Sequence, residues 1–340
     1  MKPQSPPQAR ASWKTSFSWK DALRILLALV LIGIVFSKTS LQQIQSLARE
    51  VSWTWLALSL LFYCAMTGLK SVQYWVLLGR RIPYSEVLRI VVIQNGLSNL
   101  IATPAGIASY LTLFRVEQNV RLSRSGIVFV ITKVGDVLSM AAFLLVSAAL
   151  VWERVDVLQE GVIVLLAVIL AAFAFFLAVI FLRQKFVAHM DRLLQWTRLQ
   201  RFAWVRGGMD SLRSLADHEL KTVLQTLLTS AALAFVYMSL TMAYSYTRVQ
   251  AFHIPIDFWP IIFITVMIQL VSLIPVQAFG GLGVIEFTAD YLYSLFNIVQ
   301  VDIPAILIGM RVVYYLFNLV TLLYLPLDAL LRRTVWRRSS

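Results

Sequence analysis

The sequence has very little cysteine or histidine. Among its 340 residues there is one cysteine, and there are three histidines scattered without the spacing of metal ligands: His189, His218 and His253. Cys64 lies inside an apolar run, so an intrachain disulfide is excluded and a thiolate-bound metal cluster is not expected. We therefore expect neither a metal nor a cofactor.

Acidic residues are also scarce. Seventeen Asp and Glu residues oppose 30 Lys and Arg residues, which gives a formal net charge of +13. Charged residues make up only 14% of the chain, whereas 59% of it is hydrophobic and its mean hydropathy is +0.76. Several apolar runs approach or exceed the roughly 20 residues that cross a bilayer. Because these runs are continuous rather than alternating, they favour an all-α polytopic membrane protein over a membrane β-barrel.

Six apolar stretches are predicted to be full transmembrane helices: about 21–37, 53–78, 126–151, 161–182, 222–246 and 303–327. Together they predict a single membrane domain over residues 20–331. The flanks 1–19 and 332–340 are basic, and the first, rich in Pro, Ser and Gln, is predicted to be a disordered tail. The connector 183–221 mixes basic and apolar residues, which indicates helices lying in the membrane interface. A regulatory or partner-binding role is the alternative for this connector.

Two further apolar segments are interrupted near their middle. Residues 87–114 are broken at 103–106, and residues 258–299 are broken by Pro275 and the glycines that follow it. Proline and glycine end helices, and the half after the first break is too short to cross a bilayer. We therefore predict two re-entrant hairpins, whose broken backbone must lie in protein or line a wet cavity. For the second segment, an ordinary loop between two spans is the alternative.

The basic residues support this topology. With a cytoplasmic N-terminus and two re-entrant hairpins, most Lys and Arg residues fall on the cytoplasmic side, as the positive-inside rule requires. The exceptions are predicted to lie outside (Lys38, Arg49, Arg154, Arg248) or within spans (Arg24, Lys70, Lys133, Arg311). The positive charge is therefore interpreted as a topology signal and an attraction to anionic lipid, not as a nucleic-acid interface. Both termini are expected in the cytoplasm.

The two broken segments resemble each other. One reads IQNGLSNLIATPAGIASYLTLF from Ile93, and the other reads IQLVSLIPVQAFGGLGVIEFTAD from Ile268. Each follows a span and precedes a polar link and another span. This order predicts an inverted repeat with halves at about 53–151 and 222–327, whose hairpin tips meet near the membrane midplane. Chance similarity between two apolar segments is the alternative.

At the second break the chain resembles the lysylphosphatidylglycerol synthase transmembrane-region family, also called the flippase-like domain family. The family signature P-x-x-x-x-G-G-L-G-V-R-E is matched by Pro275, Gly280, Gly281, Leu282, Gly283, Val284 and Glu286. Ile285 replaces the arginine of the signature, and the first-half motif P-G-R-x-G-E is matched only weakly by residues 104–109. Arg311 with Tyr314 also fits the family.

The resemblance extends over about residues 20–330 and implies a lipid-handling protein of the bacterial cytoplasmic membrane. The best-known members carry a cytosolic aminoacyl-transferase domain after this region. Only about a dozen residues follow the last predicted span here, so we expect a stand-alone member without that domain.

Several ionisable residues lie too deep in the apolar segments to reach water easily: Lys133, Asp136, Glu286, Asp290 and Arg311. Each such charge costs about 2.5–3.5 kcal/mol at the bilayer centre, whereas Lys70, nearer a span end, is expected to extend to the interface. One interpretation is structural: Lys133 pairs with Asp136, and Arg311 pairs with Glu286 or Asp290. The other is a substrate site.

In the substrate interpretation, Lys133 and Arg311 attract a lipid phosphate. Backbone N–H groups at the start of the helix after Gly281–Gly283 bind the same anion, and Glu286 and Asp290 hold a cationic group or a proton. The candidate substrate-binding residues are thus Lys133, Asp136, Gly280, Gly281, Gly283, Glu286, Asp290, Arg311 and Tyr314.

We therefore expect a lipid transporter that moves a phospholipid or polyprenyl-linked lipid between leaflets by rocking of the two repeats. Its partner would be an anionic or aminoacylated phospholipid or a polyprenyl-phosphate lipid. A non-transporting scaffold for envelope-lipid synthesis enzymes is the first alternative. A membrane-embedded lipid-modifying enzyme is the second, and it is not expected because no cluster has catalytic spacing. The sequence leaves the lipid, the energy source and the oligomeric state open.

Overall fold

The computed structural model describes residues 49–182, 192, 220–273, 281, 283–298, 301–328 and 330. Across these residues the chain forms nine α-helices and two short 3-10 helices, and no strand. The all-α class is confirmed for this part of the chain. The predicted first span, both terminal tails, Gly280 and most of the connector 183–221 lie outside it.

Five helices are long and apolar enough to cross a membrane. They are α3 (Trp53–Leu77), α6 (Leu122–Leu150), α7 (Gln159–Phe181), α10 (Leu220–Ala251) and α13 (Ile303–Leu322). With 20 to 32 residues each, they rise about 30–48 Å, which spans the hydrocarbon core. They coincide with five of the six predicted spans, so the chain is a multi-pass membrane protein.

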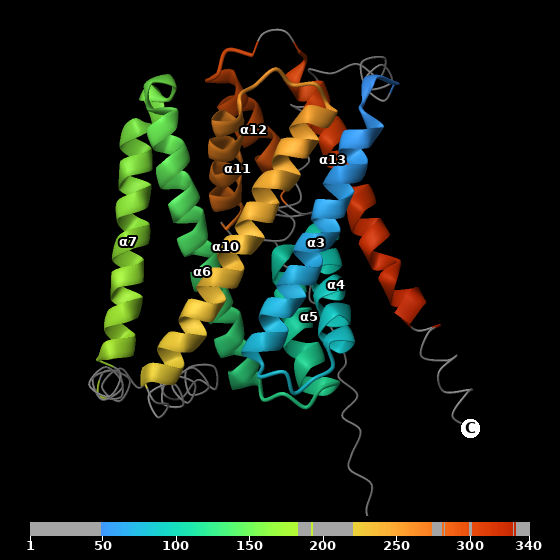
Figure 1. Ribbon diagram of the computed structural model, residues 1–340, viewed down its shortest axis with the longest axis vertical. Helices are drawn as coiled ribbons and strands as arrows, with labels where there is room; N and C mark the ends of the chain where they lie inside the picture. Colours follow the sequence, from blue (N-terminus) through green and yellow to red (C-terminus); the bar gives the residue numbers. More distant parts are fainter. Residues whose placement is uncertain are drawn as a thin grey trace, which may run out of the picture.

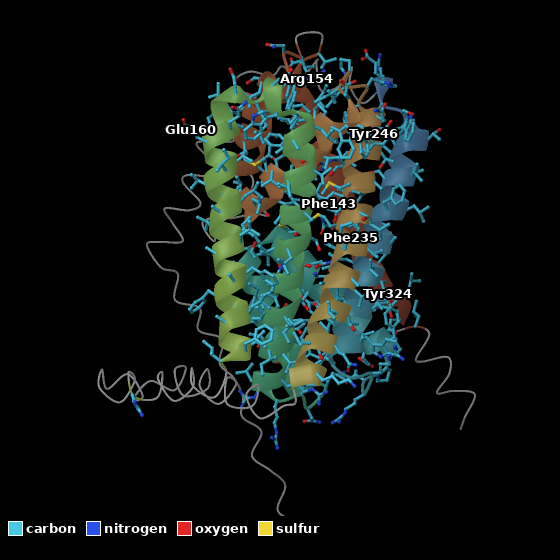
Figure 2. The ribbon with its side chains drawn as sticks, turned by 60° about the vertical axis from the view of Figure 1, so that its left-hand side comes forward. Phe143, Arg154, Glu160, Phe235, Tyr246 and Tyr324 are labelled. Carbon is cyan, nitrogen blue, oxygen red and sulfur yellow. The ribbon has the colours of Figure 1, made fainter. Side chains whose placement is uncertain are left out.

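Helix α7 forms one side of the bundle, next to α6 (Figure 1). It is the most apolar of the five long helices, and only 11% of its most apolar stretch of 18 residues is buried inside the protein. Such a helix, apolar all round and unburied by protein, suits a lipid environment. Arg154 and Glu160 mark the end of the bundle where the chain passes from α6 to α7 (Figure 2).

The two broken segments form pairs of short helices. The first pair is α4 (Tyr84–Leu100) and α5 (Thr103–Val116); the second is α11 (Phe258–Ser272) and α12 (Val284–Ser294). Their 11 to 17 residues rise only about 16–26 Å, less than the roughly 30 Å of a bilayer core. In Figure 1 the α4–α5 pair occupies the lower half of the bundle and the α11–α12 pair the upper half.

The first break lies slightly earlier than predicted. The sequence placed it at 103–106, but α4 ends at Leu100 and Thr103 already begins α5. Pro104 stands in the first turn of α5, where the N–H that proline lacks would have no helical acceptor. Proline therefore starts the second arm of this hairpin rather than forming its corner. The corner is Ile101 and Ala102, and Ala102 is extended with φ −167°.

Separate apolar clusters hold the two ends of the bundle. One cluster joins α3, α4 and α5 through side chains such as Tyr74, Ile90 and Phe114. A larger one joins α6, α10, α11, α12 and α13, and includes Met238 and Phe263. Between α6 and α10, Phe143 stacks on Phe235 with ring centroids 5.2 Å apart (Figure 2). A third, smaller cluster, of Tyr63, Met66, Tyr244 and Phe317, joins α3, α10 and α13.

Candidate functional site

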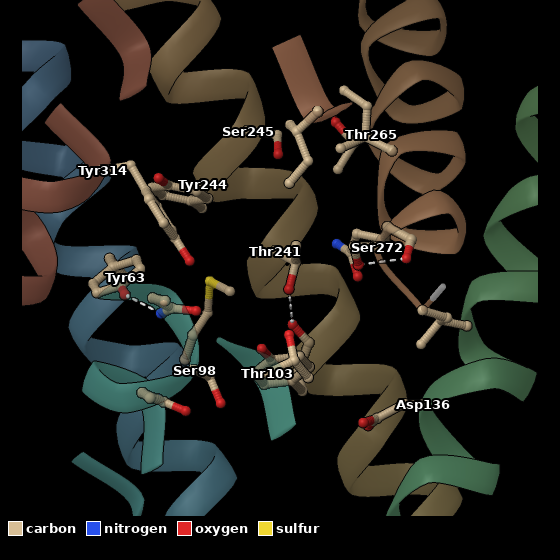
Figure 3. Close-up of a pocket in the computed structure, with 18 of the residues that line it drawn as sticks. Tyr63, Ser98, Thr103, Asp136, Thr241, Tyr244, Ser245, Thr265, Ser272 and Tyr314 are labelled. Atoms are coloured by element: carbon tan, nitrogen blue, oxygen red, sulfur yellow. Dashed lines mark hydrogen bonds between the residues drawn. The ribbon is translucent and has the colours of Figure 1, made fainter. Parts of the chain in front are cut away.

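A cavity of about 540 Å³ lies inside the bundle, lined by side chains from eight helices. Both short-helix pairs contribute to its wall, together with α3, α6, α10 and α13 (Figure 3). Its charged lining residues are Lys70, Lys133, Arg248 and Arg311, opposed by Asp136 and Glu286. The cavity therefore concentrates charge where the surrounding helices are apolar.

Asp136 on α6 is the centre of the first charged cluster. The Nζ atom of Lys70 on α3 donates to both carboxylate oxygens of Asp136, at 2.7 and 2.8 Å. Lys133 Nζ lies 3.5 Å from Oδ2 of the same carboxylate. The side chains of Lys70 and Asp136 are 10% and 5% exposed, whereas that of Lys133 is 45% exposed. Asp136 is thus held mainly by α3.

This arrangement corrects the prediction for Lys70. Lys70 does not extend to the membrane interface, because it turns inward to Asp136 and lies 4.7 Å from the ring centroid of Tyr237. A carboxylate and an aromatic face stabilise an ammonium group away from water. Lys133 remains near Asp136 as predicted from its position three residues before it, but it is the weaker partner.

The second charged cluster joins α12 to α13. Arg311 Nε donates a short hydrogen bond to Oε1 of Glu286, and the two side chains are 9% and 8% exposed. The guanidinium also lies over the rings of Tyr314 and Tyr315, 5.6 and 5.7 Å from their centroids. The sequence offered Glu286 and Asp290 as possible partners of Arg311, and the structure shows that Glu286 contacts it. Asp290 lies one turn further along α12 and outside the cavity lining.

The glycine corner positions Glu286. Gly281 and Gly283 have φ of +80° and +84°, a region that side-chain-bearing residues rarely adopt. The Gly283 N–H donates to Oε2 of Glu286 at 2.7 Å, which fixes the carboxylate at the start of α12. This N–H is therefore already occupied by the Glu286 carboxylate, while binding of an anion by the N–H groups that begin α12 stays a prediction. Neither glycine lines the cavity.

A polar stripe on α10 was missed from the sequence. Its members recur every three or four residues and line the cavity: Tyr237, Thr241, Tyr244, Ser245 and Arg248 (Figure 3). Arg248 was predicted to lie outside the membrane, beyond a span ending at 246. Instead α10 continues to Ala251 and carries Arg248 into the cavity wall. The three- and four-residue spacing of polar side chains in an apolar helix was the signal that could have revealed this face.

Helix α4 contributes a second polar face, also missed. Gln94, Asn95, Ser98 and Asn99 line the cavity. Asn99 Nδ2 donates to Oδ1 of Asn318 on α13 at 2.7 Å and so connects the first helix pair to the last helix. Amides and hydroxyls of this kind are rare at lipid depth unless they serve packing or a ligand.

The described residues bring together no three His, Cys, Asp or Glu side chains that could hold a metal ion. The cavity instead offers ammonium, guanidinium, amide, hydroxyl and phenol groups. These are donors to anionic oxygens, phosphate among them.

Spanning helices, two pairs of shorter helices and a cavity lined by both charged and apolar side chains define a multi-pass membrane protein with an internal charged site. Residues 22–321 match the model of the family described as Lysylphosphatidylglycerol synthase TM region, and the chain belongs to that family. The membership relates the protein to lipid handling. No curated protein and no solved structure matches the chain.

Proposed function

We propose that the protein moves a lipid between the two leaflets of the bacterial cytoplasmic membrane. The observation that carries this proposal is the charged cavity of about 540 Å³ between helix pairs too short to cross a bilayer. A cavity of this size suits a small polar group. The lipid headgroup would occupy it while the acyl chains remain in the surrounding bilayer.

The proposed topology is an inverted repeat with two re-entrant hairpins. The short lengths of α4, α5, α11 and α12 and the placement of the two pairs at opposite ends of the bundle support it (Figure 1). Transporters with this design expose a central site to each side in turn by rocking one repeat against the other. The distribution of basic residues supports cytoplasmic N- and C-termini.

The two buried salt bridges would serve both the fold and the transport site. Lys70–Asp136 ties α3 to α6, and Glu286–Arg311 ties α12 to α13. Each pair faces the cavity, so an incoming headgroup would compete for the same donors. Lys133, Asp136, Glu286, Arg311 and Tyr314 keep their proposed place in the site because all of them line it. The proposed role of Gly281, Gly283 and Asp290 is indirect: none of them lines the cavity, and they would act by positioning α12 beside it.

The proposal is tested by reconstituting the purified protein into phosphatidylcholine vesicles that contain a trace of acyl-labelled fluorescent phospholipid. Dithionite quenches the dye in the outer leaflet, so continued quenching reports lipids that cross. We expect faster crossing than in protein-free vesicles and no chemical change in the lipid. Crossing at the protein-free rate would favour the scaffold, and a modified lipid would reveal an enzyme; either result would overturn transport.

A further inference from the structure

The cavity contains more positive than negative charge. Of the residues that the structure describes, four basic and two acidic side chains line it, and each acid is held by one buried base. Lys70 engages both oxygens of Asp136, and Arg311 engages Glu286. Lys133 and Arg248 are the cations left over after these pairings.

Lys133 is only weakly held. Its Nζ lies 3.5 Å from a carboxylate whose two oxygens already accept shorter hydrogen bonds from Lys70. Its other described interaction is with the ring of Phe129, whose centroid lies 5.8 Å away. With 45% of its side chain exposed, the ammonium group is accessible to a ligand in the cavity.

Arg248 has even less compensation. Its guanidinium donates one long hydrogen bond of 3.4 Å to the Tyr244 hydroxyl and lies 5.1 Å from the centroid of that ring. Its Nε atom is buried without a hydrogen-bond partner. Among the salt bridges of the described residues, none includes Arg248. A planar guanidinium with unused donors is suited to a phosphate.

The two surplus cations line the cavity at different levels, Lys133 on α6 and Arg248 on the polar stripe of α10. Lys70 sits over Tyr237 and shares Asp136 with Lys133, so Tyr237 marks the level of the lower cluster. Arg248 lies eleven residues further along α10, which corresponds to about 16 Å. The hydroxyls of Thr241 and Ser245 line the cavity between these levels (Figure 3).

We propose that Lys133 and Arg248 are two successive binding positions for the phosphate of a lipid whose headgroup carries net negative charge. This inference rests on the proposed transport function and narrows its substrate class. A net anionic headgroup offsets the surplus charge of the cavity, a zwitterionic one leaves the net charge unchanged, and a cationic aminoacylated one adds to it. The α10 hydroxyls keep the phosphate hydrogen-bonded between the two positions.

Binding to the detergent-solubilised full chain tests the selectivity without requiring transport. Thermophoresis measures the binding of three probes: dioctanoyl phosphatidylglycerol, dioctanoyl phosphatidylcholine and glycerol 3-phosphate. We expect the anionic lipid to bind about tenfold more tightly than the zwitterionic one. Lys133→Gln and Arg248→Gln should each remove most of this preference, whereas Lys133→Arg and Arg248→Lys should retain it. Arg115→Gln, which removes an exposed charge outside the cavity, is the matched control.

Equal affinity for both lipids, or a preference that survives both Gln substitutions, would overturn the inference. Glycerol 3-phosphate binding as tightly as the lipid would assign the site to a soluble phosphate compound instead. The vesicle assay separates the two proposals. Suppose that labelled phosphatidylglycerol and phosphatidylcholine cross equally fast, and at the same rate in the wild-type protein as in Lys133→Gln and Arg248→Gln. In that case the transport proposal stands and the proposed selectivity fails. If the charge-dependent binding is found but no lipid crosses, the binding site stands and transport fails.

Discussion

Lys70 on α3 and Asp136 on α6 form a two-pronged salt bridge inside the bundle, with N–O distances of 2.7 and 2.8 Å. The two residues are 66 positions apart in the sequence. Their contact ties the helix before the first hairpin to the helix after it. It also occupies the acid that would otherwise neutralise Lys133. One salt bridge thus both supports the bundle and leaves Lys133 as the weakly paired cation of the cavity.

Removal of Asp136 should destabilise the protein more than removal of Lys70. Asp136→Leu leaves Lys70 and Lys133 both without their carboxylate, whereas Lys70→Met still leaves Lys133 at 3.5 Å from it. Breaking a buried pair typically costs about 3–5 kcal/mol, and we expect that for Asp136→Leu and clearly less for Lys70→Met. Thermal unfolding in detergent measures both. Arg154→Ala, which breaks an exposed pair with Asp257, is the control and should cost under about 1 kcal/mol.

The pair between Glu286 and Arg311 should show strong coupling. Arg311→Met or Glu286→Gln alone breaks this buried pair, so we expect each to lower stability by about 3–5 kcal/mol. The double variant should recover most of that loss and yet transport no lipid, because the cavity has lost both groups. Arg311→Lys should retain part of the activity. A stable and fully active Arg311→Met variant would remove Arg311 from the site.

Gly106 should tolerate no side chain. A Cβ atom there would overlap the Ser98 hydroxyl and lie 2.6 Å from the backbone oxygen of Gln94, so the close packing of α5 on α4 depends on this glycine. We expect Gly106→Ala to lower the unfolding temperature by several degrees. Gly161→Ala is the matched control, since a Cβ atom there meets nothing within 4 Å. Equal unfolding temperatures for the two variants would contradict the tight first hairpin.

Gly283 should matter for both stability and activity. Its φ of +84° costs a non-glycine residue about 1–2 kcal/mol, and its N–H orients Glu286. Gly79 is the control position, because it has a similar φ of +79° but does not line the cavity. Comparing the two positions separates the effect of backbone strain from an effect on the site. We expect Gly79→Ala to lose stability but keep its transport rate per folded molecule, whereas Gly283→Ala should lose both. Equal transport rates per folded molecule would count against a role of the corner in the site.

The topology can be read by cysteine labelling after Cys64, which is exposed on the protein surface, is replaced by serine. Single cysteines at Asn119 and Asp156 precede and follow α6, so they should label from opposite sides. We expect residue 119 and residue 200 to label only from the cytoplasm and residue 156 only from the outside. Periplasmic labelling of residue 200 would reject the proposed orientation and with it the re-entrant hairpins.

The sequence alone determined the class of this protein and most of its span positions. Long apolar runs can form helices without any tertiary partner to specify them, because lipid forces each segment to satisfy its own backbone hydrogen bonds. For the same reason the two interruptions could be recognised from proline, glycine and segment length. The depth of Lys133, Asp136, Glu286 and Arg311 followed from counting residues along those runs.

Only the tertiary structure decided which charges meet. Lys70 was expected at the interface because sequence distance from a helix end says nothing about a carboxylate on a neighbouring helix. Arg248 was expected in water because the end of α10 depends on its packing against α3 and α11 rather than on local hydropathy. Which cations of the cavity keep no close carboxylate depends on pairings between distant helices, and no pattern within one helix encodes those pairings.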